Sequence, residues 1–483
     1  MLRSTIGLVV AVLLMGSVLP ASATNYEVGP GQTLTSIGEV PWESLMPGDR
    51  VLIHRRAEPY AEKWVICRQG TEADPIVISG MPGPSGELPV IDGRNATTRT
   101  TLDFWNEGRG VVKIGGANTP EDTLPAHIVI ENLEIRSGRP SYSFTDAEGN
   151  TAVYQSNAAA IYVEKARDLV IRNCILHDSG NGLFVGAYDG QTENILIESN
   201  WIYDNGIEGS IYQHNTYTAA IHITYQYNRF GPLRGTAGGN NLKDRSAGLV
   251  VRWNWIERGN RQLDLVDAED SAVLVNHPDY NETHVYGNVL IEAEGTDNSQ
   301  ILHYGGDSGT IADYRKGTLY FYNNTVISTR AGNTTLMRLS TNDESADVRN
   351  NIIYTTASGS HLAMLASSGT MDLGHNWLTT GWVTSHDSFV GALNDDGANL
   401  EGSDPEFDQD YALQSGSPCV DAGTTLNPTV LPDHALDRQY VPHQGTTARP
   451  NDGVLDLGAF EFGLIFVDGF ESAHTSAWSS VVP

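Results

Sequence analysis

Positive charge is scarce in this sequence of 483 residues, which has 29 Lys and Arg against 59 Asp and Glu and a formal net charge of -30. The pI near 4.7 disfavours nucleic acid and anionic membranes as partners, because both carry the negative charge that an acidic protein repels. Such a composition suits a protein that is soluble outside the cell. The few basic residues therefore matter wherever they gather.

Cysteine is also rare. Cys67, Cys174 and Cys419 are widely spaced, so they form neither a metal-ligand pattern nor a disulfide framework. The odd number leaves at least one free thiol. We expect all three to be small, buried apolar residues.

Long hydrophobic runs occur only at the start of the chain. A charged start at Arg3, an apolar run from Ile6 to Leu19, and small residues at Ala21 and Ala23 predict a secretory signal peptide over residues 1–23. We therefore expect a secreted protein, extracellular, periplasmic or at the cell surface. No later stretch is apolar enough to cross a bilayer, so no membrane span is expected.

Helical periodicity of useful length is absent, and a short β-rich pattern repeats instead. In each repeat an Asn follows a β-rich segment and precedes one or two apolar residues, and a further short apolar strand comes next. The Asn residues are Asn132, Asn173, Asn200, Asn228, Asn254, Asn288, Asn324, Asn351 and Asn376. Strands that repeat at this period without helices predict an all-β fold, the right-handed parallel β-helix.

The repeated Asn has a structural role in such a fold. Asn tolerates left-handed backbone torsions and can bond its own backbone, so we expect each of these residues to turn a corner of its coil. Stacked over successive coils, the side chains would hydrogen-bond to one another as an Asn ladder.

This repeat, together with PGDRVLIHRRAEPYAEKWVICRQGTEADPIVISG near the N-terminus, resembles the secreted right-handed parallel β-helix proteins with the pectin lyase-like fold that act on polysaccharides. The N-terminal part resembles the capping coils of polysaccharide lyases of the chondroitinase B and alginate lyase type. DPEFDQDYALQSGSPCVDAG and DGVLDLGAFEF resemble a closing module of such proteins. The resemblance implies an N-terminally capped β-helix over residues 24–380 and a closing module over 381–463. It also implies a monomer that degrades an acidic polysaccharide. The last stretch, IFVDGFESAHTSAWSS, is similar to a tail found on many unrelated secreted proteins, which implies a surface or secretion-type tail over 464–483.

Six basic residues and only two acidic ones lie between residues 234 and 261. The basic residues are Arg234, Lys243, Arg245, Arg252, Arg258 and Arg261. A polyanionic substrate would need a locally positive groove, so this stretch is the candidate site. The candidate substrate-binding residues are Arg252, Arg261, Asp264 and Tyr304.

Alternation along the strands predicts which side chains line that groove. We expect the core to take Leu242, Leu263 and Leu265, and the outer face to take Lys243, Arg245 and Asp264. Neighbouring coils would add His214, Tyr217, Asp267, and His303 or Tyr304. Alternation turns Asp244 inward, where its carboxylate needs a buried partner, unless the strand ends at Lys243.

This set suits β-elimination on a uronate polysaccharide. The resembling lyases use a Lys and an Arg, and Lys243 matches their lysine. In this hypothesis Arg245 neutralises the substrate carboxylate, and Lys243 acts as base with a pKa lowered by surrounding positive charge. Tyr217, His214 or His303 would protonate the leaving oxygen. The family's Arg-His-Gly motif is replaced here by QLDLVD, with Asp264 where an arginine is wanted and LHYGGD as a partial echo one coil later.

Other functions stay open. A glycoside hydrolase would need a carboxylate pair, for which Asp264 and Asp267 are candidates. A non-catalytic carbohydrate-binding or adhesive β-helix and a C5-epimerase are further alternatives. No cofactor is certain, but the carboxylates of Asp264, Asp267, Glu269 and Asp270 could bind Ca²⁺.

Overall fold

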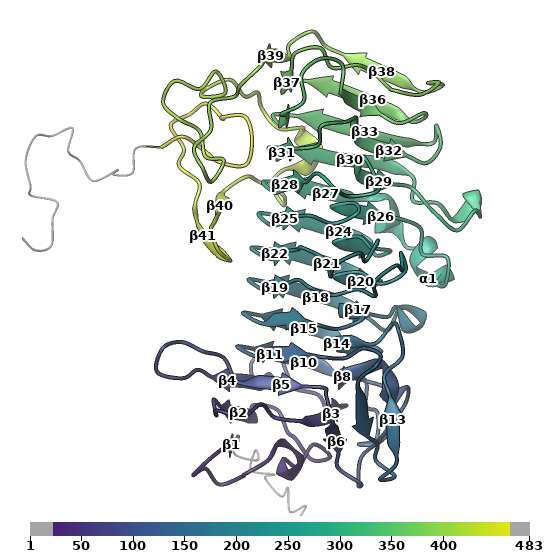
Figure 1. Cartoon of the computed structure of the whole chain (residues 1–483), viewed down its shortest axis with the longest axis vertical. Coiled ribbons are helices and arrows are strands. Elements are labelled where there is room, and N and C mark those ends of the chain that lie inside the picture. The colour runs from purple at the N-terminus through teal and green to yellow at the C-terminus, as the bar shows by residue number, and fades with distance from the viewer. Residues whose placement is uncertain (1–22, 464–483) are drawn as a thin grey trace, which may run out of the picture.

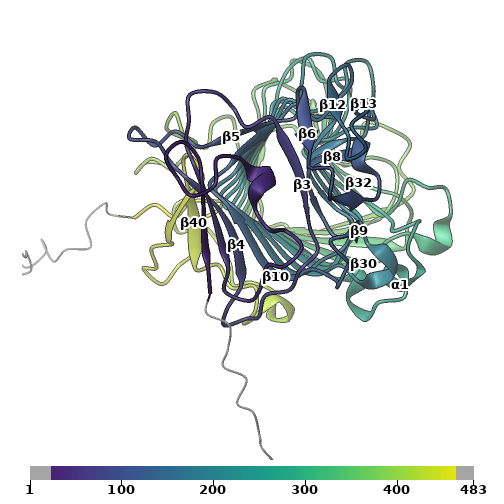
Figure 2. The same cartoon turned by 90° about the horizontal axis from the view of Figure 1, so that it is seen from below.

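The computed structural model describes residues 23–463, so the expected tail and, apart from residue 23, the expected signal peptide lie outside the described residues. The chain winds into a right-handed parallel β-helix, seen from the side in Figure 1 and from one end in Figure 2. In the middle of the molecule each coil contributes one strand to each of three sheets. The predicted all-β fold is confirmed.

The first sheet has 13 strands. They are β1 (Asn25–Val28), β2 (Arg50–His54), β4 (Ile76–Met81), β10 (Ala126–Glu131), β15 (Arg167–Arg172), β18 (Glu193–Glu198), β21 (Ile221–Gln226), β24 (Ala247–Arg252), β27 (Thr283–Tyr286), β30 (Gly317–Tyr322), β33 (Glu344–Arg349), β36 (Thr370–Gly374) and β38 (Ala392–Asp395).

The second sheet has 11 strands. They are β5 (Val90–Asp92), β11 (Glu134–Arg136), β16 (Ile175–His177), β19 (Trp201–Ile202), β22 (Arg229–Phe230), β25 (Trp255–Glu257), β28 (Val289–Glu292), β31 (Thr325–Ser328), β34 (Ile352–Thr355), β37 (Trp377–Thr379) and β39 (Leu400–Gly402).

The third sheet has 13 strands and carries the candidate site. They are β3 (Glu62–Ile66), β6 (Ala96–Thr98), β8 (Gly110–Ile114), β12 (Ser143–Thr145), β13 (Thr151–Val153), β14 (Ala159–Val163), β17 (Asn181–Val185), β20 (Thr216–Thr218), β23 (Leu242–Asp244), β26 (Leu263–Leu265), β29 (Gln300–Tyr304), β32 (Thr334–Leu339) and β35 (Leu362–Leu365).

The remaining elements are short and lie outside these sheets. They are the pair β7 (Asp103–Phe104) and β9 (Ala117–Thr119), the hairpin β40 (Arg438–Val441) and β41 (Gly445–Ala448), the helix α1 (Ala272–Val275), and the 3-10 helices η1 (Ile37–Glu39), η2 (Glu107–Arg109), η3 (Tyr188–Gly190), η4 (Pro278–Asn281), η5 (Ile311–Asp313) and η6 (Pro428–Val430). In residues 23–463 no helix has the length and hydropathy needed to cross a membrane.

Inward side chains from all three sheets form one continuous apolar core. Leu242, Leu263 and Leu265 are fully buried in it, as predicted. The three cysteines are buried and free, also as expected.

An Asn ladder runs along the turn between the first and second sheets, with one correction to the expected geometry. The Asn228 amide donates to the Asn254 side-chain oxygen at 3.0 Å, and the same bond repeats between successive members. The ladder comprises Asn200, Asn228, Asn254, Asn288, Asn324, Asn351, Asn376 and Asn399. The left-handed corner, however, is the residue before each of these members from Asn200 to Asn376, such as Tyr227 with φ 58°.

Asn132 and Asn173 depart from the ladder for the same reason. They themselves occupy the left-handed corner, with φ 59° and 52°. Leu133 and Cys174 therefore take the inward position that a ladder Asn would fill. The Cys174 backbone N–H still donates to the Asn200 side chain at 2.9 Å, so the ladder begins there.

The inward carboxylate of Asp244 has the partner that the fold requires. Its Oδ1 lies 3.3 Å from Nη2 of Arg315, and Oδ2 accepts hydrogen bonds from the hydroxyls of Thr218 and Ser246 at 2.7 and 2.8 Å. Arg315 comes from the insertion between β29 and β30, so this buried pair fastens that insertion to the coil below.

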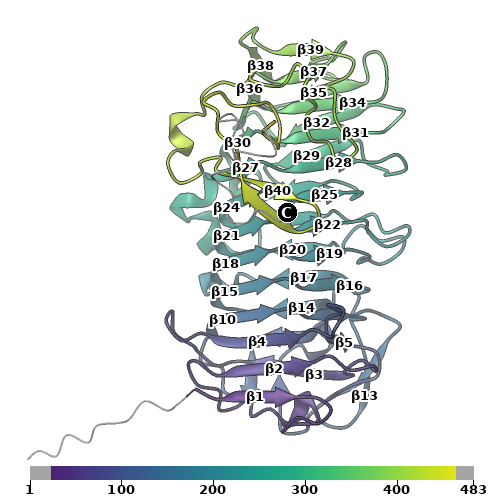
Figure 3. The ribbon, with the colours of Figure 1, turned by 90° about the vertical axis from the view of Figure 1, so that its left-hand side faces the viewer.

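The coils continue past residue 380, through β39, before the chain folds back. The segment after Gly402 lies along the outside of the second sheet, as Figures 1 and 3 show. Its Tyr440 and Phe460 pack against Trp255 and Val289. This segment covers a face of the β-helix away from the candidate site and leaves the third sheet open.

Candidate active site

An outward column of side chains runs along the third sheet, because its strands stack in register. The column reads Tyr162, Phe184, Tyr217, Lys243, Asp264, His303 and Arg338. The sequence had placed four of these residues together, and the register brings them onto adjacent strands about 4.8 Å apart.

A groove of about 590 Å³ lies over the middle of this column and is called the charged groove below. It is lined by Ile211, Tyr212, His214, Tyr217, Gly238, Asn240, Lys243, Arg245, Asn260, Arg261, Asp264, Glu269, Asn298, Asp307 and Ser308. Three of these side chains are basic and three are acidic, so the positive charge of the 234–261 stretch is balanced here by carboxylates from the same and later coils.

Lys243 points out of the core but is not the exposed base that we expected. Its side chain is only 10% exposed, and its ammonium pairs with Asp264 at 3.2 Å and with Asp307. Burial disfavours the charged lysine, but the two carboxylates outweigh it and raise the pKa of Lys243 above its ordinary value. The expectation of a lowered pKa is therefore wrong, because the neighbours that decide it are acidic.

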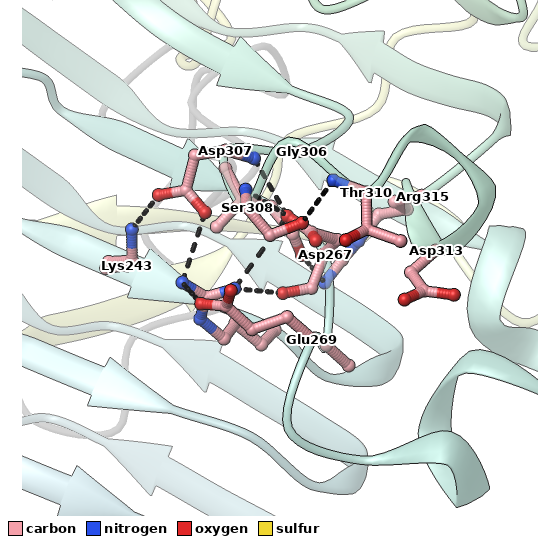
Figure 4. A network of polar contacts seen from close by, with 12 residues as sticks. Lys243, Asp267, Glu269, Gly306, Asp307, Ser308, Thr310, Asp313 and Arg315 are labelled. Carbon is pink, nitrogen blue, oxygen red and sulfur yellow. Dashed lines mark hydrogen bonds and ion pairs between the residues drawn. The ribbon is translucent and has the colours of Figure 1, made fainter.

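Arg245 pairs with two carboxylates, those of Asp307 and Glu269, and Figure 4 shows both of them in the polar network that includes Lys243. Nη2 of Arg245 contacts Glu269 at 3.0 Å and Asp307 at 3.1 Å. Its Nε donates to the phenolic oxygen of Tyr217 at 3.0 Å. The Arg245 side chain itself is nearly buried, whereas Glu269 and Asp307 are 38% and 35% exposed, so the carboxylates are the accessible groups.

Asp307 is the residue that the sequence analysis missed. It lies in a tight loop after β29, and its backbone N–H donates to Asp267 at 2.8 Å, which holds the loop against the groove. Burial opposes ionisation, but Lys243 and Arg245 outweigh it and keep the pKa of Asp307 below its ordinary value. The sequence Gly305-Gly306-Asp307 directly after β29 was the signal that could have indicated a tight turn carrying a carboxylate.

Asp264 belongs to a hydrogen-bonded chain beneath this loop. Its Oδ1 is 3.0 Å from Nδ1 of His303, and Nε2 of His303 is 2.9 Å from Oγ of Ser340. Burial disfavours ionisation of Asp264, but the His303 hydrogen bond and Lys243 hold its pKa far below the ordinary value. An ionised carboxylate can only accept, so Nδ1 of His303 must carry the proton that it donates to Asp264. In neutral His303, Nε2 is then unprotonated and accepts a hydrogen bond from the Ser340 hydroxyl.

Ser340 in turn holds the loop that carries Asp307. The Gly306 backbone N–H donates to Ser340 Oγ at 2.9 Å. The chain of Asp264, His303 and Ser340 therefore positions the Asp307 loop. Neither His303 nor Ser340 lines the charged groove, so His303 is not placed as the expected proton donor.

His214 lies at the edge of the charged groove beside Tyr217, with ring centroids 5.7 Å apart. Its Nδ1 accepts the Asn240 backbone N–H at 2.9 Å, so Nε2 carries the proton. Burial and the charge of Lys243 lower the pKa of His214 to about 3. His214 is therefore a neutral hydrogen-bond donor.

Two expected substrate-binding residues lie elsewhere. Tyr304 is fully buried in the core, because alternation on β29 turns His303 out and Tyr304 in. Arg252 ends β24 in the first sheet, where it donates to Gln226 and Tyr286. Arg261 does line the groove, and it donates to Gln300 at 2.7 Å.

The carboxylates considered for Ca²⁺ do not form a metal site. Asp264 is engaged by Lys243 and His303. Asp267 is fully buried and accepts the backbone N–H of Asp307. Among residues 23–463, no group of three or more His, Cys, Asp or Glu side chains is arranged to hold a metal ion.

No protein-family model matches the chain, and no curated protein sequence matches it. Solved structures share its fold at low identity. Pectate lyase Pel9A is 12% identical with a TM-score of 0.46, covering 92% of this chain and 97% of its own. An alginate lyase from Paenibacillus sp. str. FPU-7 is 12% identical with a TM-score of 0.42, covering 72% and 92%. PfbA, a surface adhesin of Streptococcus pneumoniae, is 12% identical with a TM-score of 0.31, covering 72% and 82%.

The expected resemblance to β-helix polysaccharide-active proteins is thus found in the fold. At this similarity the comparisons concern the fold alone, and a fold does not determine a reaction.

Proposed function

We propose that the protein cleaves a polysaccharide chain in the charged groove, by hydrolysis with Asp307 and Glu269 as the catalytic carboxylates. The observation that carries this proposal is their shared contact with Nη2 of Arg245, at 3.1 and 3.0 Å. Two oxygens this close to one nitrogen lie no more than about 6 Å apart, and this upper limit is compatible with the spacing of about 5–5.5 Å between the carboxyl groups of a retaining glycosidase but excludes the wider part of the range of about 6.5–9.5 Å found in inverting enzymes.

The environment of Asp307 supports one of the two roles, and the proposal gives the other role, that of general acid and base, to Glu269. Asp307 is held ionised by Lys243 and Arg245, which suits a nucleophile. In the first step an Asp307 oxygen bonds to the anomeric carbon while Glu269 gives its proton to the departing glycosidic oxygen. In the second step Glu269 takes a proton from water, whose oxygen displaces Asp307.

The charge balance of the groove favours an uncharged sugar at the cleaved bond. Lys243, Arg245 and Arg261 each contact a carboxylate already. A substrate carboxylate would have to displace Asp307 or Glu269 from its basic partner. The carboxylate that stays in place would then repel it. The acidic polysaccharide that the basic stretch suggested would therefore gain little electrostatic stabilisation in the charged groove.

β-Elimination at a uronate is the second candidate, favoured by the contact between Arg245 and the Tyr217 phenol beside Lys243. In that mechanism Arg245 binds the substrate carboxylate, Lys243 takes the C5 proton and Tyr217 protonates the leaving oxygen. It requires Lys243 to lose a proton that Asp264 and Asp307 stabilise.

The deciding experiment incubates the protein with xylan, galactomannan, mixed-linkage glucan, polygalacturonate and alginate. Hydrolysis produces new reducing ends without the ultraviolet absorbance of an unsaturated uronate. On the polysaccharide that is cleaved, Asp307→Asn and Glu269→Gln should each lower kcat by about 10²–10⁴-fold.

Asp279→Asn is the matched control, because Asp279 is similarly exposed and pairs with His222 outside the groove. It should keep wild-type activity. Unsaturated products that need Lys243 and survive Asp307→Asn would establish elimination instead. Binding without any product would point to an adhesive or binding protein.

A further inference from the structure

A second cavity, called the aromatic recess below, adjoins the charged groove on the side of the preceding coils. It encloses about 400 Å³, and its lining includes Arg109, Phe184, Tyr188, Tyr217 and Arg245. Tyr217 and Arg245 line both cavities. The aromatic recess and the charged groove are therefore parts of one continuous depression along the third sheet.

The floor of the aromatic recess is a fixed aromatic surface. Phe184 on β17 pairs in register with Tyr217 on β20. The Phe184 ring is stacked on the ring of Tyr162 in the preceding coil, with centroids 4.8 Å apart. Phe184 lies two strands from Lys243, or about 10 Å along the sheet. A single sugar ring cannot cover Phe184 and also reach Asp307.

The wall of the recess is Tyr188, in the turn η3. Its side chain is partly exposed, and its ring stacks on Trp105 with centroids 6.2 Å apart. The Arg109 guanidinium lies 4.9 Å from the Phe184 ring centroid, and its Nε has no hydrogen-bond partner in the described part of the chain. Apolar ring faces edged by polar groups match a pyranose, whose C–H groups pack on aromatic rings while its hydroxyls need partners.

The opposite side of the charged groove is open as well. A third cavity of about 500 Å³, formed by the turns after β22, β25 and β28, shares Gly238 and Asn260 with the groove. Two adjoining cavities leave room for chain on both sides of Asp307 and Glu269.

We infer that the aromatic recess binds a pyranose residue of the same polysaccharide at least one residue away from the cleaved bond, and that the enzyme cuts within the chain. This inference rests on the proposed hydrolysis. Continuity of the recess with the charged groove, through Tyr217 and Arg245, identifies the occupant as the substrate chain itself.

The kinetic test uses Tyr188→Ala and Phe184→Ala with a size series of oligosaccharides made from the polysaccharide that the wild type cleaves. Each substitution should raise KM for long oligosaccharides by about tenfold and leave kcat, and the KM of the shortest cleaved oligosaccharide, unchanged. Val390→Ala, an exposed position outside these cavities, is the control. An equal rise of KM at every length, or none at any length, would overturn the inference.

The mode of cleavage is read from early products. Internal cutting gives mixed oligosaccharides and a rapid fall in viscosity. Release of a single monosaccharide or disaccharide from the start would overturn it.

A binding arm separates failure of this inference from failure of the proposed hydrolysis. Asp307→Asn, alone and combined with Tyr188→Ala, is run on affinity gels containing xylan, mixed-linkage glucan or polygalacturonate. Retardation that Tyr188→Ala removes supports the recess even when the wild type yields no reducing ends, and unchanged retardation counts against it. Quenching of Trp105 fluorescence, identified with Trp105→Phe, should accompany binding.

Discussion

The carboxylate of Asp244 and the guanidinium of Arg315 form an ion pair 3.3 Å long in which both side chains are 0% exposed. The pair joins the inner side of β23 to the insertion after β29, the same insertion whose first residues carry Asp307. The inner face of the strand thus helps to hold a loop on its outer face.

Arg315→Ala should therefore lower the free energy of unfolding by about 3–5 kcal/mol, because it leaves the Asp244 charge buried without its partner. Urea unfolding followed by circular dichroism measures the loss. Arg349→Ala is the matched control, since the Arg349 pair with Asp347 is partly exposed and should be worth no more than about 1 kcal/mol. Equal losses for the two variants would mean that burial of the Asp244 pair is not the cause.

The Asn ladder predicts a different cost. Asn254→Ala and Asn288→Ala each remove the side-chain oxygen that accepts from the buried backbone N–H and the side-chain amide of the preceding ladder member, which should cost about 1–3 kcal/mol. Thermal melting should shift down for both, while Asn150→Ala, in an exposed turn, should not shift it. Unchanged melting of both ladder variants would argue that the ladder is dispensable.

The pH profile of activity should reflect Asp307. A nucleophile must be ionised, and Lys243 and Arg245 outweigh burial and hold the pKa of Asp307 below its ordinary value. Activity should therefore persist as pH falls and be lost only at a pH below the range in which an ordinary aspartate is protonated. Lys243→Met removes one of the two cations, so the acid limb of kcat/KM should move to higher pH. If the acid limb of kcat/KM does not move, Asp307 is not the group whose ionisation controls activity at low pH.

Ser340 should act as a positioning residue. Ser340→Ala removes the hydroxyl that accepts from Gly306 and meets His303. We expect kcat to fall by about 10-fold to 100-fold, as for a small misplacement of a reacting group, with KM and melting temperature nearly unchanged. Ser340→Thr should restore activity, and Ser368→Ala, in the next coil, is the control. A large drop in melting temperature would indicate a structural role instead.

Stability should fall in mild acid where the C-terminal segment docks. His284 on β27 stacks on His434 of that segment with ring centroids 3.7 Å apart. Burial and the neighbouring His434 lower the pKa of His284 to about 3, and burial lowers the pKa of His434 as well. Because the unfolded state binds these protons first, stability present above pH 6.5 is lost as pH falls toward 3, by up to about 1.4 kcal/mol per pH unit for His284 and by less for the more exposed His434.

His434→Phe should reduce this dependence, since it keeps a ring in the stack and removes one protonation. The measurement is melting temperature between pH 7 and pH 4, with buried His214 and His303 accounting for part of the remaining slope. An identical slope in wild type and variant would show that His434 does not contribute.

The sequence by itself determined the β-helix and the direction of its side chains. The repeat of about two dozen residues and the alternation within strands are local properties, and they recur in the sequence of each coil. The inward positions of Leu242 and Leu263, and the outward position of Lys243, follow from them. The one-residue error at the corners arose because both Asn132 and the true ladder members fit the same local pattern.

Only the tertiary structure decided the chemistry of the candidate site. Lys243 and Arg245 look like an excess of positive charge in the sequence because the carboxylate that pairs with both of them, Asp307, comes from a coil more than sixty residues later. The pKa of Lys243 depends on those partners and on burial, and neither is a local property of a chain segment. Insertions between coils have no fixed period. The repeat therefore predicted the strands beneath the Asp307 loop but could not predict where the loop itself would fold.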